Sequence, residues 1–150
     1  MKKYLFISML MSLFILGLAF AASESFTLVT KEEGALKEAP HGLYEVGRHL
    51  NNGPDIKIVS PQLDDKNKLP VKLAILFVPV EGKEVDLAKL KVEYLKLITI
   101  DLTDRVLPYT TKEGIKIEKA DLPSGKHTIR ITVGDVSGGV TEQIFTMKLE

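Results

Sequence analysis

Alternation of inward-facing and polar residues with a period of two is the strongest constraint on the fold of this chain. In KHTIRITV (126–133), every second residue from His127 to Val133 faces one side of an extended strand, and Thr128, Arg130 and Thr132 face the other. This period is typical of a strand that buries one face. Similar runs occupy 55–61, 71–79, 114–123 and 140–150. With turn residues between them, they predict an all-β, antiparallel β-sandwich of about seven strands.

One segment, VDLAKLKVEYLKLITIDLT (85–103), has two interpretations. An extended chain would place Leu90, Val92 and Tyr94 on one strand face, continuing to Ile98, Ile100 and Leu102. A helix would instead align Leu87, Leu90, Tyr94, Leu97 and Ile98, and the Leu, Lys, Ala and Glu content favours helix. We predict a short helical turn near residues 86–90 followed by strand, because the Ile-Thr-Ile run favours strand.

The N-terminus has the layout of a secretory signal peptide. Lys2 and Lys3 precede an apolar stretch that ends in Ala19-Phe20-Ala21, which offers small residues at the positions read by signal peptidase. We therefore expect cleavage after Ala21 and a periplasmic or secreted protein. An uncleaved anchor is the alternative, since Tyr4–Ala22 is long enough to span a bilayer. No cysteine follows the junction, which excludes a lipoprotein.

The composition excludes several kinds of site. The chain contains no cysteine, so disulfides, thiol nucleophiles and thiolate metal sites are ruled out. Of the 20 basic residues two lie in the signal segment, which leaves 18 against 20 acidic residues. Charges of both signs alternate without a basic block, so we expect no nucleic-acid partner.

The turn signal NNGPD (51–55) divides the mature chain. We expect a leader over residues 22–53, with a strand in SFTLVT, a broken helical turn in KEEGALKE and loop beyond. Residues 54–150 form one domain. Two pairs of apolar residues face away from the predicted core: Leu76 with Val78, and Leu95 with Leu97. We hypothesise that the leader folds over one pair, through Phe26, Leu28, Leu43 and Tyr44, and leaves the other for a partner.

Several motifs of the 54–150 segment occur in the order seen in one group of exported domains. They are GPDIKIVSP, GKEVDLAKLKV followed by IDLT, and LPSGKHTIRITVGDVSGG. In these motifs the chain resembles bacterial immunoglobulin-like (fibronectin type III-like) domains. It is also similar to short exported single-domain proteobacterial proteins with TDRV before an LPxGxH ending. The resemblance implies an immunoglobulin-like sandwich of about 100 residues. The chain departs from it by lacking a glycine turn before IDLT, a cysteine pair and tryptophan.

His127 lies where such sandwiches often carry a tyrosine that closes a strand corner. Leu122 and Gly125 belong to the preceding turn, and we assign all three a structural role. We expect an imidazole N–H to donate to a backbone carbonyl near Asp121 or Leu122. A functional role would require a second ligand or a carboxylate nearby.

Asp135 opens the GDVSGG run (134–139). Aspartate and serine cap turns and glycines accept positive φ, so we predict a hairpin turn. The alternative, a calcium loop, would need more acidic ligands than this spacing supplies.

DLTDRV (101–106) and Tyr109 supply the candidate binding residues Asp101, Asp104, Arg105 and Tyr109. The structural interpretation is that Thr103 caps a short turn and Arg105 pairs with a carboxylate. The functional one is a polar ledge for a sugar or a peptide.

The two leader histidines, His41 and His49, are spaced too widely for a zinc pair. We find no nucleophile elbow, phosphate loop or acid–base carboxylate pair. We therefore expect no catalytic residues, no cofactor and no metal.

These observations favour a non-catalytic exported module that binds another envelope or periplasmic protein. The alternative is a carbohydrate-binding module. Such modules stack sugars on exposed aromatic rings, and this chain has no tryptophan and only Tyr44, Tyr94 and Tyr109 after the signal segment.

Overall fold

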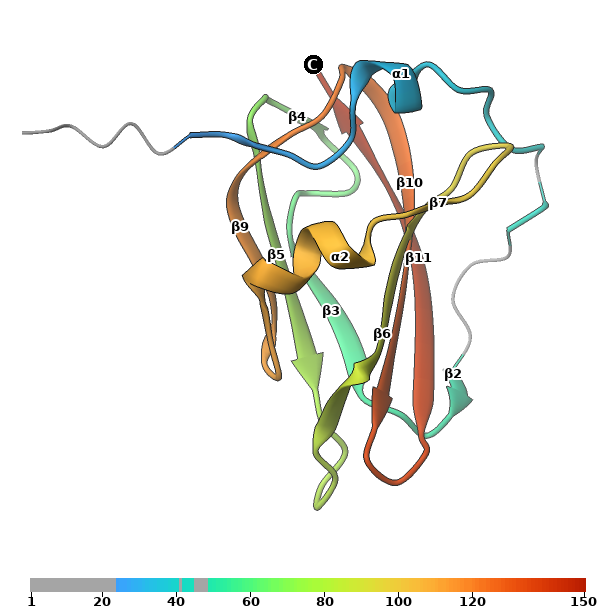
Figure 1. Cartoon of the computed structure of the whole chain (residues 1–150), viewed down its shortest axis with the longest axis vertical. Coiled ribbons are helices and arrows are strands. Elements are labelled where there is room, and N and C mark those ends of the chain that lie inside the picture. Colours follow the sequence, from blue (N-terminus) through green and yellow to red (C-terminus); the bar gives the residue numbers. More distant parts are fainter. Residues whose placement is uncertain (1–23, 41, 45–48) are drawn as a thin grey trace, which may run out of the picture.

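The protein folds into two β-sheets packed face to face. A computed structural model describes residues 24–40, 42–44 and 49–150, with only the backbone described at 49–51. The strands form a five-stranded and a six-stranded sheet. Figure 1 shows the two sheets as two layers. The predicted all-β sandwich is thus confirmed. The predicted signal peptide and its predicted cleavage site lie outside the described residues. No helix in the described ranges is long and apolar enough to cross a membrane.

The five-stranded sheet has the order β1-β9-β5-β3, with β8 added to β9. Its strands are β1 (Phe26–Thr27), β3 (Asp55–Ser60), β5 (Val71–Val78), β8 (Thr110–Thr111) and β9 (Gly114–Asp121). β1 runs parallel to β9, whereas the other neighbours are antiparallel. The strand predicted in SFTLVT is therefore present, and it extends the sheet rather than standing apart from it.

The six-stranded sheet has the order β2-β11-β10-β6-β7, with β4 added in parallel to β11. Its strands are β2 (His49–Asn51), β4 (Lys66–Asn67), β6 (Val85–Tyr94), β7 (Ile100–Asp101), β10 (Gly125–Asp135) and β11 (Val140–Leu149). Three short helices lie outside the sheets: α1 (Lys31–Gly34), α2 (Thr103–Val106) and η1 (Leu107–Tyr109). The six strands of six or more residues carry the sandwich, and the shorter strands pair with the outer edges of β6, β9 and β11.

The core lies between the sheets because the inward faces of the long strands are apolar. Along β5 the residues alternate strictly between buried and less buried positions. The inward residues of β5 and β10 are Val71, Leu73, Ile75, Phe77, Ile129, Ile131 and Val133. Removing each large aliphatic side chain from water contributes about 1.5–3 kcal/mol, which offsets the entropy lost on ordering the strands.

The prediction of a helical turn near residues 86–90 is wrong, because these residues belong to strand β6. β6 pairs with β10, and the pairing passes from Lys91↔Thr132 to Asp86↔Gly134. Four residues of β6, the Leu-Ala-Lys-Leu run 87–90, thus lie opposite the single residue Val133 of β10, and the irregularity falls on the run with the local helix preference. The strand predicted to follow also ends early, because residues 95–99 form a turn before β7.

Neighbouring segments cover the outer edges of β6 and β9. The amide of Val92 in β6 donates to the hydroxyl of Thr103 at 3.0 Å, and Leu102 N–H donates to Val92 O at 2.8 Å. These bonds place α2 against the edge of β6 (Figure 1). On the other sheet, β1 and β8 pair with opposite ends of β9.

Candidate functional site

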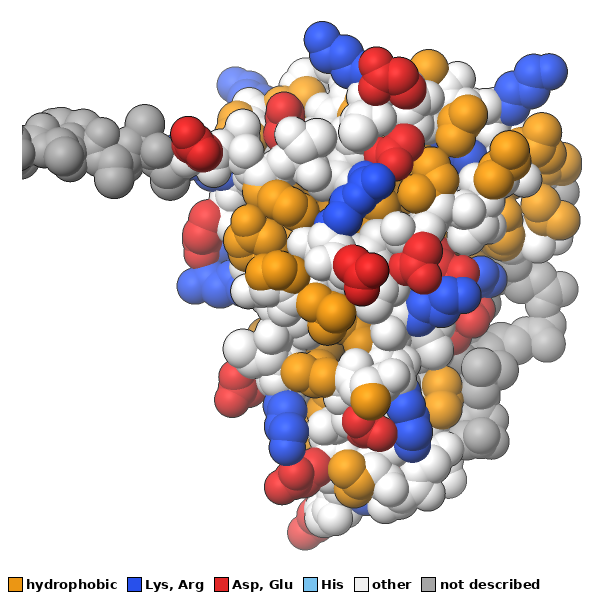
Figure 2. All heavy atoms as spheres, viewed as in Figure 1, with side chains coloured by type: hydrophobic (Ala, Val, Ile, Leu, Met, Phe, Trp, Pro, Cys, Tyr) orange, Lys and Arg blue, Asp and Glu red, His pale blue; other side chains and the backbone are white. Residues whose placement is uncertain are grey.

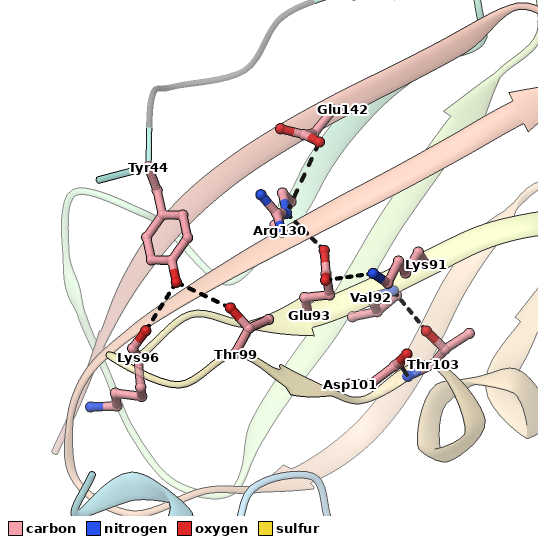
Figure 3. A network of polar contacts seen from close by, with 10 residues as sticks. All are labelled: Tyr44, Lys91, Val92, Glu93, Lys96, Thr99, Asp101, Thr103, Arg130 and Glu142. Atoms are coloured by element: carbon pink, nitrogen blue, oxygen red, sulfur yellow. Dashed lines mark hydrogen bonds and ion pairs between the residues drawn. The ribbon is translucent and has the colours of Figure 1, made fainter. Parts of the chain in front are cut away.

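A ladder of charged side chains crosses the outer face of the six-stranded sheet (Figure 3). Arg130 Nε donates to Glu93 Oε2 at 2.7 Å, and Lys91 Nζ lies 2.7 Å from Glu93 Oε1. Oε2 of Glu142 lies 4.0 Å from Nε of Arg130. Glu93 is only 5% exposed, and burial alone would raise its pKa, but the bonds from Arg130 and Lys91 outweigh burial and hold the pKa below its usual range. The ladder is therefore internally neutralised rather than poised for proton transfer.

The segment after α1 crosses this face, and we call its described residues, 36–40 and 42–44, the strap. Leu97 N–H donates to Lys37 O at 2.8 Å, and Lys96 forms an ion pair with Glu38. At the far end of the strap, the hydroxyl of Tyr44 donates to Lys96 O at 3.0 Å (Figure 3). These contacts tie the strap to the turn between β6 and β7.

Tyr44 also links the strap to the charged ladder. Its hydroxyl lies 3.1 Å from Thr99 Oγ1, and the guanidinium of Arg130 lies 5.7 Å from its ring centroid. Stacking of a guanidinium on an aromatic face is favourable, so the ring shields one side of the ladder.

A hollow of about 300 Å³ lies beneath the strap. The strap and the outer face of the six-stranded sheet line it with Glu38, Ala39, Pro40, Gly42, Tyr44, Leu95, Lys126, Thr128, Ile144 and Thr146. Leu95 is buried here, whereas Leu97 remains 53% exposed. The leader thus covers one residue of the predicted Leu95–Leu97 pair, and Leu76 and Val78 stay exposed on the other sheet.

Exposed aliphatic side chains gather where the strap meets the β6–β7 turn. We call Leu36, Leu43, Leu97 and Ile98 the apolar tip. Leu43, Leu97 and Ile98 are 54%, 53% and 66% exposed. Figure 2 shows hydrophobic side chains grouped at this corner of the molecule, at the upper right of the view. Large aliphatic side chains clustered in water are costly, and such patches often mark contact surfaces.

His127 is fully buried and belongs to a hydrogen-bonded chain inside the sandwich. Its Nε2 lies 2.7 Å from Pro123 O, one residue beyond the carbonyls expected from the sequence, and its Nδ1 lies 3.0 Å from the Tyr94 hydroxyl. Because a carbonyl only accepts, Nε2 carries the proton and Nδ1 accepts from Tyr94. Burial lowers the pKa of His127 despite the Pro123 bond, which raises it. Leu122 is buried, and Gly125 adopts φ 132° at the start of β10.

Asp135 is buried at the opposite end of β10. Its Oδ1 accepts the amides of Ser137 and Gly139 at 2.8 and 2.9 Å, so the carboxylate organises the β10–β11 turn. Burial would raise the pKa of Asp135, but these amides and the charges of Lys83 and Lys89 lower it overall. Its Oδ2 is buried without a hydrogen-bond partner in the structure.

The candidates predicted in DLTDRV do not converge on one ligand site. Asp101 accepts the Thr103 amide at 2.8 Å, so Asp101 rather than Thr103 caps the turn. Arg105 is engaged by Glu33 of α1, while Asp104 is exposed. Tyr109 packs at a tilt of 46° against Phe26, with ring centroids 4.7 Å apart.

The described residues contain no group of three or more histidine, aspartate or glutamate side chains placed to hold a metal ion. His41 and the side chain of His49 lie outside the described residues. Sequence reasoning missed Glu93, Lys96 and the strap contacts of Tyr44. The sequence does carry a signal for them: Glu93 and Lys96 interrupt the otherwise apolar run VEYLKL. A charged side chain that is buried in such a run needs an oppositely charged or hydrogen-bonding partner. Comparisons with known protein families, with curated proteins and with solved structures gave no match.

Proposed function

We propose that this protein is a non-catalytic, exported immunoglobulin-like module that binds another protein of the bacterial periplasm or cell envelope. The N-terminal signal pattern supports export. The motifs shared with immunoglobulin-like domains fall on β3, on β6 and on the β10–β11 hairpin, in that order along the chain. Two packed sheets are compatible with that resemblance.

The observation that carries the binding role is the apolar tip. Its side chains come from two segments far apart in the sequence, which the strap contacts hold side by side. Ile98 is the most exposed large hydrophobic residue of the described chain. Exposed aliphatic groups on a surface held in place by hydrogen bonds suit a protein partner, because burying them releases water without a large ordering cost.

The charged residues near the tip support a binding role rather than a catalytic one. Lys96 and Glu38 are paired with each other, and Arg130 is held between Glu93 and the Tyr44 ring. These groups maintain the shape of the surface that carries the tip.

The tyrosines give less support to the carbohydrate alternative. Tyr94 is buried, and the Tyr44 ring lies near Arg130. Tyr109 is 38% exposed, but its ring packs at a tilt of 46° against Phe26, which occupies part of its face. A sugar platform needs an exposed aromatic face.

Site-specific photo-crosslinking in the native cells tests the proposal. A photoreactive residue in place of Ile98 should yield a discrete protein adduct. The matched control is Val136, which is 63% exposed in the β10–β11 turn at the other end of the sandwich. Identical adducts from both positions, or no adduct from Ile98, would contradict the proposal. Ile98→Asp should abolish capture of the same adduct partner, and Val136→Asp should not.

A further inference from the structure

β3 is an open edge of the five-stranded sheet. Its residues, Asp55–Ser60, pair only with β5 among the described strands. No other main-chain hydrogen bond within the described ranges reaches this strand. An edge of this kind presents unpaired amide and carbonyl groups to any extended segment that approaches it.

The regular part of this edge is short and has a defined centre. At one end, Asn52 bridges to Val140 of the other sheet, and Gly53 packs closely on the Val140 backbone. The chain therefore joins the five-stranded sheet only from Asp55. At the other end, the pairing with β5 shifts after Ile58. The regular segment is 55–58, and Ile56 stands at the centre of its Asp-Ile-Lys triplet.

Two opposite charges flank that centre. Asp55 and Lys57 are both exposed, whereas Ile56 between them points into the core and is buried. Alternation places the two charged side chains on the same outer face of the sheet. Neither forms an ion pair with another described residue, unlike Lys72 and Lys116 on the same sheet, which both pair with Glu118.

We propose that β3 pairs antiparallel with β3 of a second copy of this chain, about a two-fold axis through Ile56. This register places each Asp55 directly opposite Lys57 of the other copy, so one interface gains two equivalent ion pairs. Moving the axis by one residue to Lys57 would instead set the two lysines against each other. The charge pattern therefore selects both the partner and the register.

The pairing has a structural consequence beyond the edge. A two-fold axis that joins two antiparallel edge strands stands perpendicular to the sheet, so the outer faces of both copies lie on the same side. The exposed Leu76 and Val78 of β5 then occur twice on one continuous surface. This inference is independent of the role proposed for the apolar tip, which lies on the other sheet.

The dimer should be weak and dependent on concentration. A contact along a four-residue edge buries less than the roughly 1,200 Å² typical of stable interfaces. Sedimentation velocity of the protein over a series of concentrations measures this association directly.

Charge reversal on β3 tests the register. Lys57→Asp and Asp55→Lys each create like charges opposite one another and should each raise the dimer dissociation constant about tenfold or more. The double variant Asp55→Lys/Lys57→Asp restores opposite charges and should return the constant to near the wild-type value. The matched control is Lys68→Asp, since Lys68 is exposed and lies outside β3.

The proposal is overturned if the wild type stays monomeric up to about 1 mM. It is also overturned if the double variant dimerises as weakly as the single variants, or if Lys68→Asp weakens the dimer as much as the β3 substitutions do. Hydrogen exchange supplies a second readout that does not depend on variants. The outward amides of residues 55–58 should gain protection as concentration rises, and unchanged exchange in a dimeric sample would contradict edge pairing.

Discussion

Arg105 of α2 holds Glu33 of α1 through two parallel hydrogen bonds. Nη1 donates to Oε2 at 2.8 Å and Nη2 donates to Oε1 at 2.6 Å, and Nη1 also donates to Leu28 O at 2.9 Å. Glu33 in turn accepts the amide of Thr30 and completes a capping box at the start of α1. The pair joins the N-terminal segment to the connection that follows β7. The Arg105 bonds lower the pKa of Glu33 to about 2.

This pair should make stability dependent on pH in the acidic range. The carboxyl pKa is about 2 in the folded protein and 4.5 as the reference value, so the stabilisation is present above pH 4.5 and is lost as pH falls toward 2. Glu33→Gln should lower the free energy of unfolding by about 1–2 kcal/mol at pH 7, less than the full linkage value because Arg105 is partly exposed to solvent. Urea denaturation should show this difference shrinking between pH 5 and pH 2. A constant difference, or an equal effect of Glu81→Gln in the exposed β5–β6 turn, would contradict it.

Replacing His127 with phenylalanine should be costly. The Tyr94 hydroxyl and the Pro123 carbonyl would lose their bonds inside the protein, so we expect a loss of about 2–3 kcal/mol by chemical denaturation. If His127→Phe keeps the wild-type free energy of unfolding, the hydrogen bonds of His127 to Tyr94 and Pro123 contribute little to stability.

His127 should also leave a signature near neutral pH. Burial lowers its pKa in the folded state, so the unfolded chain binds the proton first as pH falls. Stability from this group is present above about pH 6.5 and declines below it. The wild type should therefore lose stability between pH 7 and pH 5 by more than His127→Phe does. Parallel curves for the two proteins would contradict this assignment.

Gly114 should not tolerate a side chain. It adopts φ 146°, and a Cβ there would overlap the carbonyl oxygen of Ile75 on the paired strand. Gly114→Ala should cost about 3 kcal/mol or more, measured by thermal or urea unfolding. Gly82→Ala is the matched control, because Gly82 also has positive φ but open space around its Cβ position, and it should cost about 1 kcal/mol. Equal losses of stability in the two variants would show that backbone strain alone sets the cost and that the overlap with Ile75 adds nothing.

The stability of the fold should depend on the ion pair between the buried ammonium of Lys96 and Glu38. Burial lowers the pKa of Lys96, but the bond that its ammonium donates to Glu38 and its interaction with Tyr94 outweigh burial and raise the pKa overall. Glu38→Gln should destabilise by about 1–2 kcal/mol because it leaves a buried charge without its partner. Lys96→Met should be nearly neutral, since an unbranched apolar chain can occupy the same buried space. A larger loss for Lys96→Met than for Glu38→Gln in urea unfolding would reverse this reasoning.

The alternating strands could be predicted because each carries its own burial pattern. His127 to Val133 alternates with threonine and arginine in the sequence and alternates between buried and less buried positions in the structure. A strand that buries one face needs no information from elsewhere to show this pattern. Residues 86–90 could not be predicted in this way. Their helix-forming composition is overridden because the residues on both sides of 87–90 pair with β10, more than 40 positions away in the sequence.

The sequence by itself determined the fold class, because the period of apolar residues is a local property that only a two-layer β structure can bury. Tertiary structure alone decided which polar residues meet. Glu33 and Arg105 lie 72 positions apart, and Tyr44 reaches Lys96 across 52. Such contacts depend on how the sheets stack and where the strap crosses them. The apolar tip arises in the same way, because Leu43 and Leu97 become neighbours only once the strap is tied to the β6–β7 turn.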